Sequence, residues 1–295
     1  MIKNGDIIGP WKVNKEISKI SSDRGVYEVS TYQIDVSDLL EKLNGISVWS
    51  MKIVNTKMSN SEIEVIKKYQ LHGVPNSVIM PIDELYISGR YNNNYEWYIM
   101  EKCNGDIHKY IKSAYQNWDV LLECVCNFLK NLHQKKKLIH GDLKLKNILY
   151  KASDNTFKVC DYESCDIPDL ETTCINNDSI GYYYYYIGAI PNEPILSYKM
   201  DLLAFGTILW AVYCNESLEN KIFKWQQHAI NYYETRCKYN YYEKLEELKS
   251  LESMPKIIEE YFKIVSRVHP FVNAPPSDDI YDDIINLKKY KFKEI

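Results

Sequence analysis

The chain has 295 residues, and its 45% apolar and 26% charged residues are typical of a folded globular protein rather than a disordered one. Its 36 basic and 40 acidic residues give a formal net charge of −4, so no basic excess points to nucleic acid or an acidic membrane surface as a partner. The longest apolar stretch, 202–214, is shorter than the about 20 residues of a membrane span, and the first residues lack the apolar segment of a signal peptide. Because the eight cysteines form no CxxC pair, we expect reduced thiols in an intracellular protein. We also expect a monomer or a weak oligomer.

The choice among similar residues is also biased. Only 4 of the 36 basic residues are Arg, and Tyr occurs 26 times. Lys, Tyr, Asn and Ile have AT-rich codons, so we infer an AT-rich genome, such as that of a large DNA virus or an AT-rich microbe. A viral protein of this kind would act in the host cytoplasm or nucleus.

The first third of the chain has the alternating apolar and polar residues of strands. Capping residues and helical periodicity predict one helix from Ser59 to Tyr69. We predict strands over 11–17, 26–32, 48–54, 78–87 and 95–102, polar turns over 18–25 and 89–94, and a short helical turn over 38–43.

Helical patterns dominate after Asn104. Residues 106–137 predict two helices, 200–214 and 217–265 are mostly helical, and a short strand is predicted over 156–160. The expected fold class is α+β, with a β-rich part over 1–103 and a larger helical part over 104–295.

A polar motif, LIHGDLKLKNILY, occupies residues 138–150. It resembles the catalytic loop of eukaryotic-type protein kinases, H-[RG]-D-[LI]-K-x-x-N-[IV]-L. In that family the Asp faces the substrate hydroxyl, the Lys approaches the transferred phosphoryl group, and the Asn binds a phosphate-bound Mg²⁺. The resemblance implies these catalytic roles for Asp142, Lys144 and Asn147, whereas the alternative is a polar turn before a strand.

Asp161 follows the predicted strand over 156–160, fourteen residues after Asn147. Kinases place the metal-binding Asp of D-F-G at this spacing, whereas an isolated Asp after a strand would indicate only a turn. The resemblance therefore implies that Asn147 and Asp161 bind Mg²⁺, with Mn²⁺ as an alternative.

Lys52 lies in the predicted strand over 48–54, where the family has the Lys that holds the α- and β-phosphates of ATP. Its partner in the family is a Glu on the following helix. Glu62 and Glu64 are both candidates here. Helical phase favours Glu62, because apolar residues follow it at i+3 and i+4, whereas lysines follow Glu64.

Residues 98–106 resemble the hinge between the two lobes of these kinases, with Met100 in the gatekeeper place. The resemblance places a further set of residues around the nucleotide: Glu101 and Cys103 through their backbone, and Ile17, Gly25 and Leu149. Asp201 matches the family's Asp that fixes the backbone of the catalytic loop, and a helix N-cap is its alternative.

Four features depart from the family pattern. Only Gly25 remains of the glycine-rich loop over 18–27, so close backbone contacts to phosphates are fewer. Gly141 replaces the usual Arg that pairs with a phosphorylated activation loop, although H-G-D also occurs in casein-kinase-like and vaccinia-related-kinase-like enzymes. Glu163 replaces the Gly of D-F-G, and A-P-E is not recognisable near 189–194.

The resemblance runs from about residue 11 to 290 and implies a bilobal kinase-like fold. The function favoured is an ATP-dependent serine/threonine protein kinase that transfers the γ-phosphoryl group to protein hydroxyls, with similarity to baculovirus-type kinases. Two alternatives stay open. One is a pseudokinase that acts as a binding or scaffolding module, and the other is a small-molecule phosphotransferase of the aminoglycoside or choline kinase type.

Overall fold

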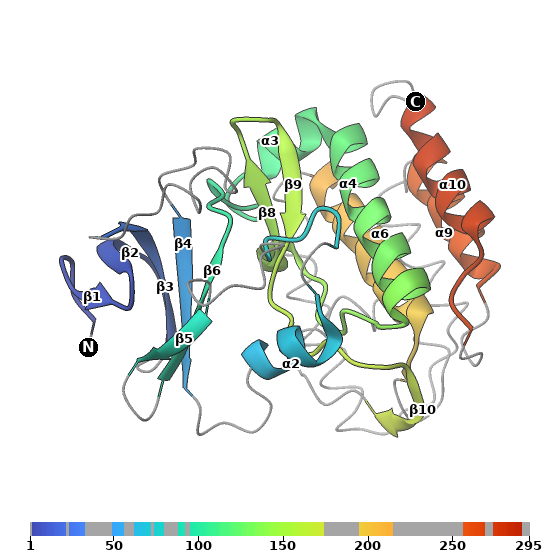
Figure 1. The fold of residues 1–295 in the computed structure, drawn as a ribbon. Helices are drawn as coiled ribbons and strands as arrows, with labels where there is room; N and C mark the ends of the chain where they lie inside the picture. Colours follow the sequence, from blue (N-terminus) through green and yellow to red (C-terminus); the bar gives the residue numbers. More distant parts are fainter. Residues whose placement is uncertain are drawn as a thin grey trace, which may run out of the picture. The chain divides into compact units, whose positions relative to one another are not determined.

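The computed structural model describes residues 2–21, 24–32, 49–55, 62–71, 74–79, 88–91, 95–173, 195–214, 256–268 and 274–290. Contacts divide the chain into two compact units, one made of residues 1–104 and 160–163 and the other of residues 105–159 and 164–295. The first unit contains the large sheet, and the second contains most of the helices (Figure 1). The predicted α+β class, with strands first and helices after them, is confirmed.

The first unit is built on a six-stranded antiparallel sheet. Its strands are, in sheet order, β1 (Ile7–Ile8), β2 (Trp11–Ser21), β3 (Arg24–Thr31), β4 (Trp49–Asn55), β6 (Tyr95–Met100) and β5 (Ser88–Tyr91). Alternating residues of the strands bury one face, as the period of two requires. The buried cluster on this face contains Ile8, Trp11, Val13, Tyr27, Val29, Trp49, Met51, Ile53, Trp97 and Ile99. Lys52 falls between two members of the cluster and therefore points to the opposite face.

Two predicted turns are wrong in part. Strand β2 continues to Ser21 and β3 begins at Arg24, so most of the polar stretch 18–25 is strand, because pairing across the hairpin satisfies its backbone groups whatever the side chains are. Strand β5 occupies the start of the turn predicted over 89–94. Gly89 suits this strand because a Cβ there would lie 2.6 Å from the Trp97 ring, which covers it.

Helix α2 (Glu62–Tyr69) and residues 74–79 also belong to this unit. Helix α2 buries Glu62, Ile63 and Val65. Ile79 forms a bridge with Met100, and the Glu101 N–H donates to the Val78 carbonyl at 3.0 Å. The helical turn predicted over 38–43 and most of the strand predicted over 78–87 lie outside the described residues.

The second unit consists mainly of helices α3 (Ile111–Gln116), α4 (Trp118–Asn131), α6 (Tyr198–Cys214), α9 (Lys256–Ser266) and α10 (Asp278–Asn286). A π-helical turn (Leu132–Lys136) extends α4, which confirms the two helices predicted over 106–137. Helix α6 is apolar around its whole circumference and is buried accordingly. Of the helix predicted over 217–265, residues 215–255 lie outside the described part.

Short strands accompany these helices. Strands β7 (Gly105–Asp106), β8 (Ile148–Lys151) and β9 (Thr156–Val159) form an antiparallel sheet, and β10 (Asp169–Thr173) pairs with β11 (Ile195–Leu196). The hairpin of β8 and β9 begins at Ile148, so the last three residues of the motif at 138–150 are strand. No helix among the described residues is long and apolar enough to cross a membrane.

Candidate active site

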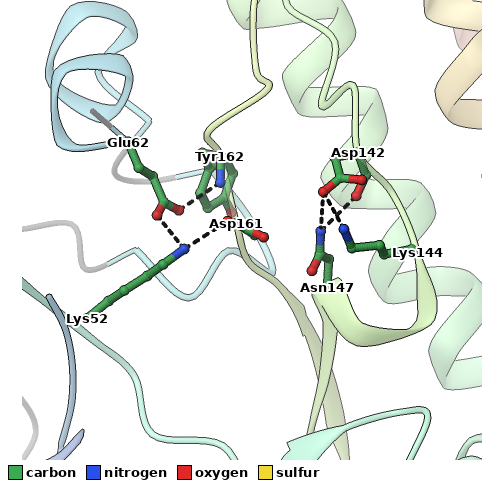
Figure 2. Close-up of polar contacts among 7 residues, drawn as sticks. All are labelled: Lys52, Glu62, Asp142, Lys144, Asn147, Asp161 and Tyr162. Carbon is green, nitrogen blue, oxygen red and sulfur yellow. Dashed lines mark hydrogen bonds and ion pairs between the residues drawn. The ribbon is translucent and has the colours of Figure 1, made fainter. Parts of the chain in front are cut away.

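Lys52 on β4 contacts two carboxylates in the first unit. Its Nζ lies 2.5 Å from Glu62 Oε2 and 2.8 Å from Asp161 Oδ1 (Figure 2). Only 9% of the Lys52 side chain and 2% of the Glu62 side chain are exposed. Burial alone would lower the pKa of Lys52, but the charges of Glu62 and Asp161 outweigh it and raise that pKa, so the ammonium stays charged.

Glu62 occupies the first turn of α2 and makes a second contact. Its Oε1 accepts the backbone N–H of Tyr162 at 2.8 Å, so one carboxylate holds both Lys52 and the segment that carries Asp161. Glu64, the other candidate, is exposed on the same helix. Helical phase therefore indicated the residue that the structure places beside Lys52.

The segment 160–163 has an unusual backbone. Asp161 has φ 71°, in the left-handed region that Asp tolerates better than most residues. This turn directs the Asp161 carboxylate to Lys52 and the Tyr162 ring into the interior, where it is fully buried. The Tyr162 hydroxyl lies 2.6 Å from Ser77 Oγ, which also accepts the N–H of Ile79 at 3.0 Å.

Asp142, Lys144 and Asn147 meet in the second unit, in the loop between α4 and β8. Asp142 Oδ2 lies 2.7 Å from Lys144 Nζ and 3.1 Å from Asn147 Nδ2 (Figure 2). Asn147 Nδ2 also donates to the Asp142 carbonyl at 2.8 Å, which closes the loop upon itself. A single 3-10 turn, Leu145–Asn147, brings these side chains together over five residues.

Asp201 fixes the backbone just before Asp142. It accepts the N–H of His140 at 2.7 Å and the N–H of Gly141 at 3.1 Å, and the His133 ring lies 2.9 Å away. Burial alone would raise the pKa of Asp201, but these hydrogen bonds outweigh it and lower that pKa, so the carboxylate is ionised. The alternative of a helix N-cap is wrong, because α6 begins at Tyr198 and Asp201 lies inside its first turn.

Gly141 cannot be replaced without strain. Its φ is 76°, and a Cβ at this position would lie 2.5 Å from the carbonyl oxygen of Ser164. Any L-residue would therefore meet both an unfavourable backbone conformation and a backbone atom. An Arg at this position, as is usual in the family, would meet the same strain.

The residues predicted around the nucleotide lie in both units. Met100 is buried at the end of β6, and the Glu101 N–H is already used by Val78. Ile17 lies on β2 with 43% of the residue exposed, and Gly25 lies in β3 with the Tyr27 ring 2.8 Å from where a Cβ would stand. Cys103 follows β6 and is partly exposed, whereas Leu149 belongs to β8 of the second unit.

Sequence reasoning missed several polar partners. Ser77 bonds Tyr162 across 85 residues, and His133 bonds Tyr281 across 148 residues. All four side chains are buried. Their residue types form no recognisable motif in the sequence. A Tyr or His on the apolar face of a helix or beside a strand cannot be distinguished from an ordinary core residue.

Comparisons with known proteins agree on one family. The protein kinase domain model matches residues 45–279. The human lymphokine-activated killer T-cell-originated protein kinase is 36% identical over 90 residues, which cover 28% of this chain and 26% of that protein. A probable serine/threonine-protein kinase of Dictyostelium discoideum is 22% identical over 170 residues, 50% of this chain and 15% of that protein.

The chain therefore spans less than two thirds of the length of either curated relative. Among solved structures, the PK-1 kinase of Cydia pomonella granulovirus matches with a TM-score of 0.48 and 18% sequence identity. That match covers 69% of this chain and 70% of the viral one.

Proposed function

Since the chain belongs to the protein kinase family, we propose that it is a catalytically active kinase that transfers the γ-phosphoryl group of ATP to serine and threonine hydroxyls of proteins. One observation carries the proposal. The charged groups on which this transfer depends in the family are all present, and each is held by hydrogen bonds within its own unit. These groups include a buried ammonium between two carboxylates, on which phosphoryl transfer depends in the family.

Asp142 is the base in this proposal. Its carboxylate would accept the proton of the substrate hydroxyl, and its contacts with Lys144 and Asn147 hold it in one rotamer before substrate arrives. Lys144 also brings a positive charge to the place where negative charge grows on the transferred group. Asp201 supports both residues by fixing the backbone at His140 and Gly141.

The donor atoms suit a divalent cation. The amide nitrogen of Asn147 donates to Asp142, so the amide oxygen of Asn147 points away from Asp142 (Figure 2). Asp161 Oδ1 contacts Lys52, and the second carboxylate oxygen of Asp161 points away from Lys52. Amide and carboxylate oxygens are the ligands that Mg²⁺ and Mn²⁺ prefer. Asn147 and Asp161 would hold the metal and Lys52 the phosphates of ATP, and the metal would neutralise phosphate charge during transfer.

The preference for serine and threonine rests on the residues that follow Asp142. Leu143, Lys144 and Lys146 resemble the serine/threonine kinases, and the matching Dictyostelium protein is named as a probable member of that class. Glu163, the third residue of the triplet that begins with Asp161, is the feature that favours a small-molecule phosphotransferase instead. Lys144, which contacts Asp142, is the protein kinase residue and opposes that alternative.

The proposal is tested by transfer of labelled γ-phosphate from Mg-ATP to generic basic and acidic proteins, followed by phosphoamino acid analysis. We expect phosphoserine or phosphothreonine with the wild-type chain and none with Asp142→Asn, which keeps the side-chain shape but cannot accept a proton. Label on aminoglycosides or choline alone would transfer the assignment to the small-molecule class. No transfer to any acceptor, with folded protein, would leave the pseudokinase.

A further inference from the structure

A line of buried polar groups joins helix α10 to the catalytic loop inside the second unit. The Tyr281 hydroxyl lies 2.6 Å from His133 Nδ1, and His133 Nε2 lies 2.9 Å from Asp201 Oδ2. Asp201 in turn holds the N–H groups of His140 and Gly141. Tyr281 and His133 are fully buried, and Asp201 is 1% exposed.

The protons in this line can be assigned from chemistry. Asp201 is ionised, so it accepts and His133 Nε2 carries the hydrogen between them. Burial raises the pKa of Tyr281, so its hydroxyl keeps its proton and donates it to His133 Nδ1. Among the described residues the Tyr281 hydroxyl makes no other polar contact, so a doubly protonated His133 would leave that hydroxyl proton without an acceptor.

Contacts between α10 and α4 place Tyr281 beside His133. Lys130 of α4 forms ion pairs with Asp278 and Asp282, which flank Tyr281 on α10. The Cys126 thiol of α4 lies 3.6 Å from the Tyr281 carbonyl oxygen. The Tyr281 ring therefore approaches His133 from a helix that contacts α4, and the π-helical turn that contains His133 extends α4.

We propose that Tyr281 is a positioning residue for catalysis: its hydroxyl fixes the ring and the tautomer of His133, and through Asp201 it holds the backbone on which Asp142 stands. This inference rests on the proposed kinase function. A Phe at position 281 would fill the same space, so packing alone does not require the hydroxyl. We expect loss of the Tyr281 hydroxyl to lower kcat rather than to raise KM for ATP, because Tyr281 bonds no residue assigned to ATP.

The first test needs no activity. Nitrogen NMR of the wild-type chain with labelled histidine gives signals for only six residues, and His133 is identified by loss of its signals in His133→Gln. We expect a neutral ring with Nε2 protonated and Nδ1 accepting a hydrogen bond. A doubly protonated ring, or one protonated at Nδ1, would overturn the proposal even if the chain proved to have no kinase activity.

The second test compares two variants that each lose one buried hydroxyl. Tyr281→Phe breaks the bond to His133, whereas Tyr261→Phe breaks a bond of 2.7 Å from another buried Tyr to the Leu202 carbonyl. We expect Tyr281→Phe to lower kcat about ten-fold, with KM for ATP within about two-fold, and to speed hydrogen exchange at the His140 and Gly141 amides. Tyr261→Phe should lose similar thermal stability with kcat nearly unchanged.

Equal effects of the two variants on kcat would overturn the proposal, as would unchanged His133 signals in Tyr281→Phe. The amide exchange and the histidine signals report on the backbone and the ring directly. They therefore separate a failure of this inference from a failure of the proposed kinase function, which would remove turnover in the wild-type chain and leave both spectroscopic signatures in place.

Discussion

The Lys52 ammonium is almost inaccessible to water and lies between Glu62 and Asp161. Removing one partner of a buried ion pair leaves the other without compensation, which typically costs about 3–5 kcal/mol. We therefore expect Lys52→Met to abolish phosphoryl transfer and also to lower the free energy of unfolding by about 3 kcal/mol, measured by urea denaturation.

Glu62 and Glu64 provide a matched comparison for this assignment. Glu62→Gln weakens the contacts with Lys52 and with the Tyr162 N–H, whereas Glu64→Gln changes an exposed side chain on the same helix. Transfer activity should fall clearly in the first variant and stay near the wild-type rate in the second. The reverse ranking would move the role of ion-pair partner to Glu64.

Gly141 illustrates a second kind of local constraint, one of backbone space. Gly141→Ala places a Cβ 2.5 Å from the Ser164 carbonyl oxygen at a φ of 76°, whereas Gly5→Ala, at φ 92°, meets nothing within 4 Å. The difference between the two variants isolates the clash from the backbone strain. We expect Gly5→Ala to cost about 1 kcal/mol of unfolding free energy and Gly141→Ala clearly more, with loss of transfer only in Gly141→Ala.

A similar cost in both variants would show that the loop at Gly141 adjusts without penalty. The same strain argument applies to Gly141→Arg, which restores the usual family residue. That variant should lower activity rather than introduce control by phosphorylation, because the side chain cannot be accommodated in the present loop.

At the scale of elements, buried hydrogen bonds attach the segment 160–163 to α2 and to residues 74–79. Tyr162→Phe removes one partner of the Ser77 contact, and Ser77→Ala also leaves the Ile79 N–H without its acceptor. We expect Tyr162→Phe to cost about 1 kcal/mol and Ser77→Ala more, because an orphaned buried group carries its own penalty.

The double variant completes a cycle whose coupling energy, measured by urea denaturation, should be of the order of 1 kcal/mol. Strictly additive effects would mean that the contact between Ser77 and Tyr162 contributes nothing. By comparison, the ion pairs of Lys130 with Asp278 and Asp282 lie near the surface, where such pairs are worth about 1 kcal/mol or less. The number of polar contacts that an element makes is therefore a poor measure of how strongly it is attached to the rest of its unit.

At the scale of the whole molecule, the prediction concerns metal and nucleotide together. Only Gly25 remains where the family has its glycine-rich loop, so we expect fewer backbone contacts to phosphate and a larger contribution from the metal. ATP alone should raise the melting temperature little, and Mg-ATP clearly more, because a ligand at 100 times its Kd stabilises by about 2.7 kcal/mol. Asp161→Asn should remove the increment that depends on Mg²⁺.

Equal stabilisation by ATP with and without metal would contradict this expectation and would favour a pseudokinase. An Asp161→Asn chain that kept full activity would instead mean that the metal ligands are misassigned. Both outcomes can be read from thermal melting and transfer assays on the full chain.

The order of motifs and the α+β class follow from the sequence by itself, because both depend on residues close together in the chain. Asp142 and Asn147 are five residues apart in one loop, and the strand before Asp161 can be recognised from its own residues. Helical phase in α2 likewise distinguished Glu62 from Glu64 without any knowledge of β4. Such local information is enough to nominate charged residues with a defined chemical role.

The partners of those residues were decided only by the tertiary structure. Polar residues 18–21 and 24–25 form strand because another strand lies beside them, and Gly89 lies in β5 because Trp97 covers it. Tyr281 meets His133 across 148 residues, and Tyr162 meets Ser77 across 85. A buried hydroxyl or imidazole needs a hydrogen-bond partner. That partner is whichever polar group the fold brings within hydrogen-bond distance, and residues close together in the sequence do not indicate which group that is.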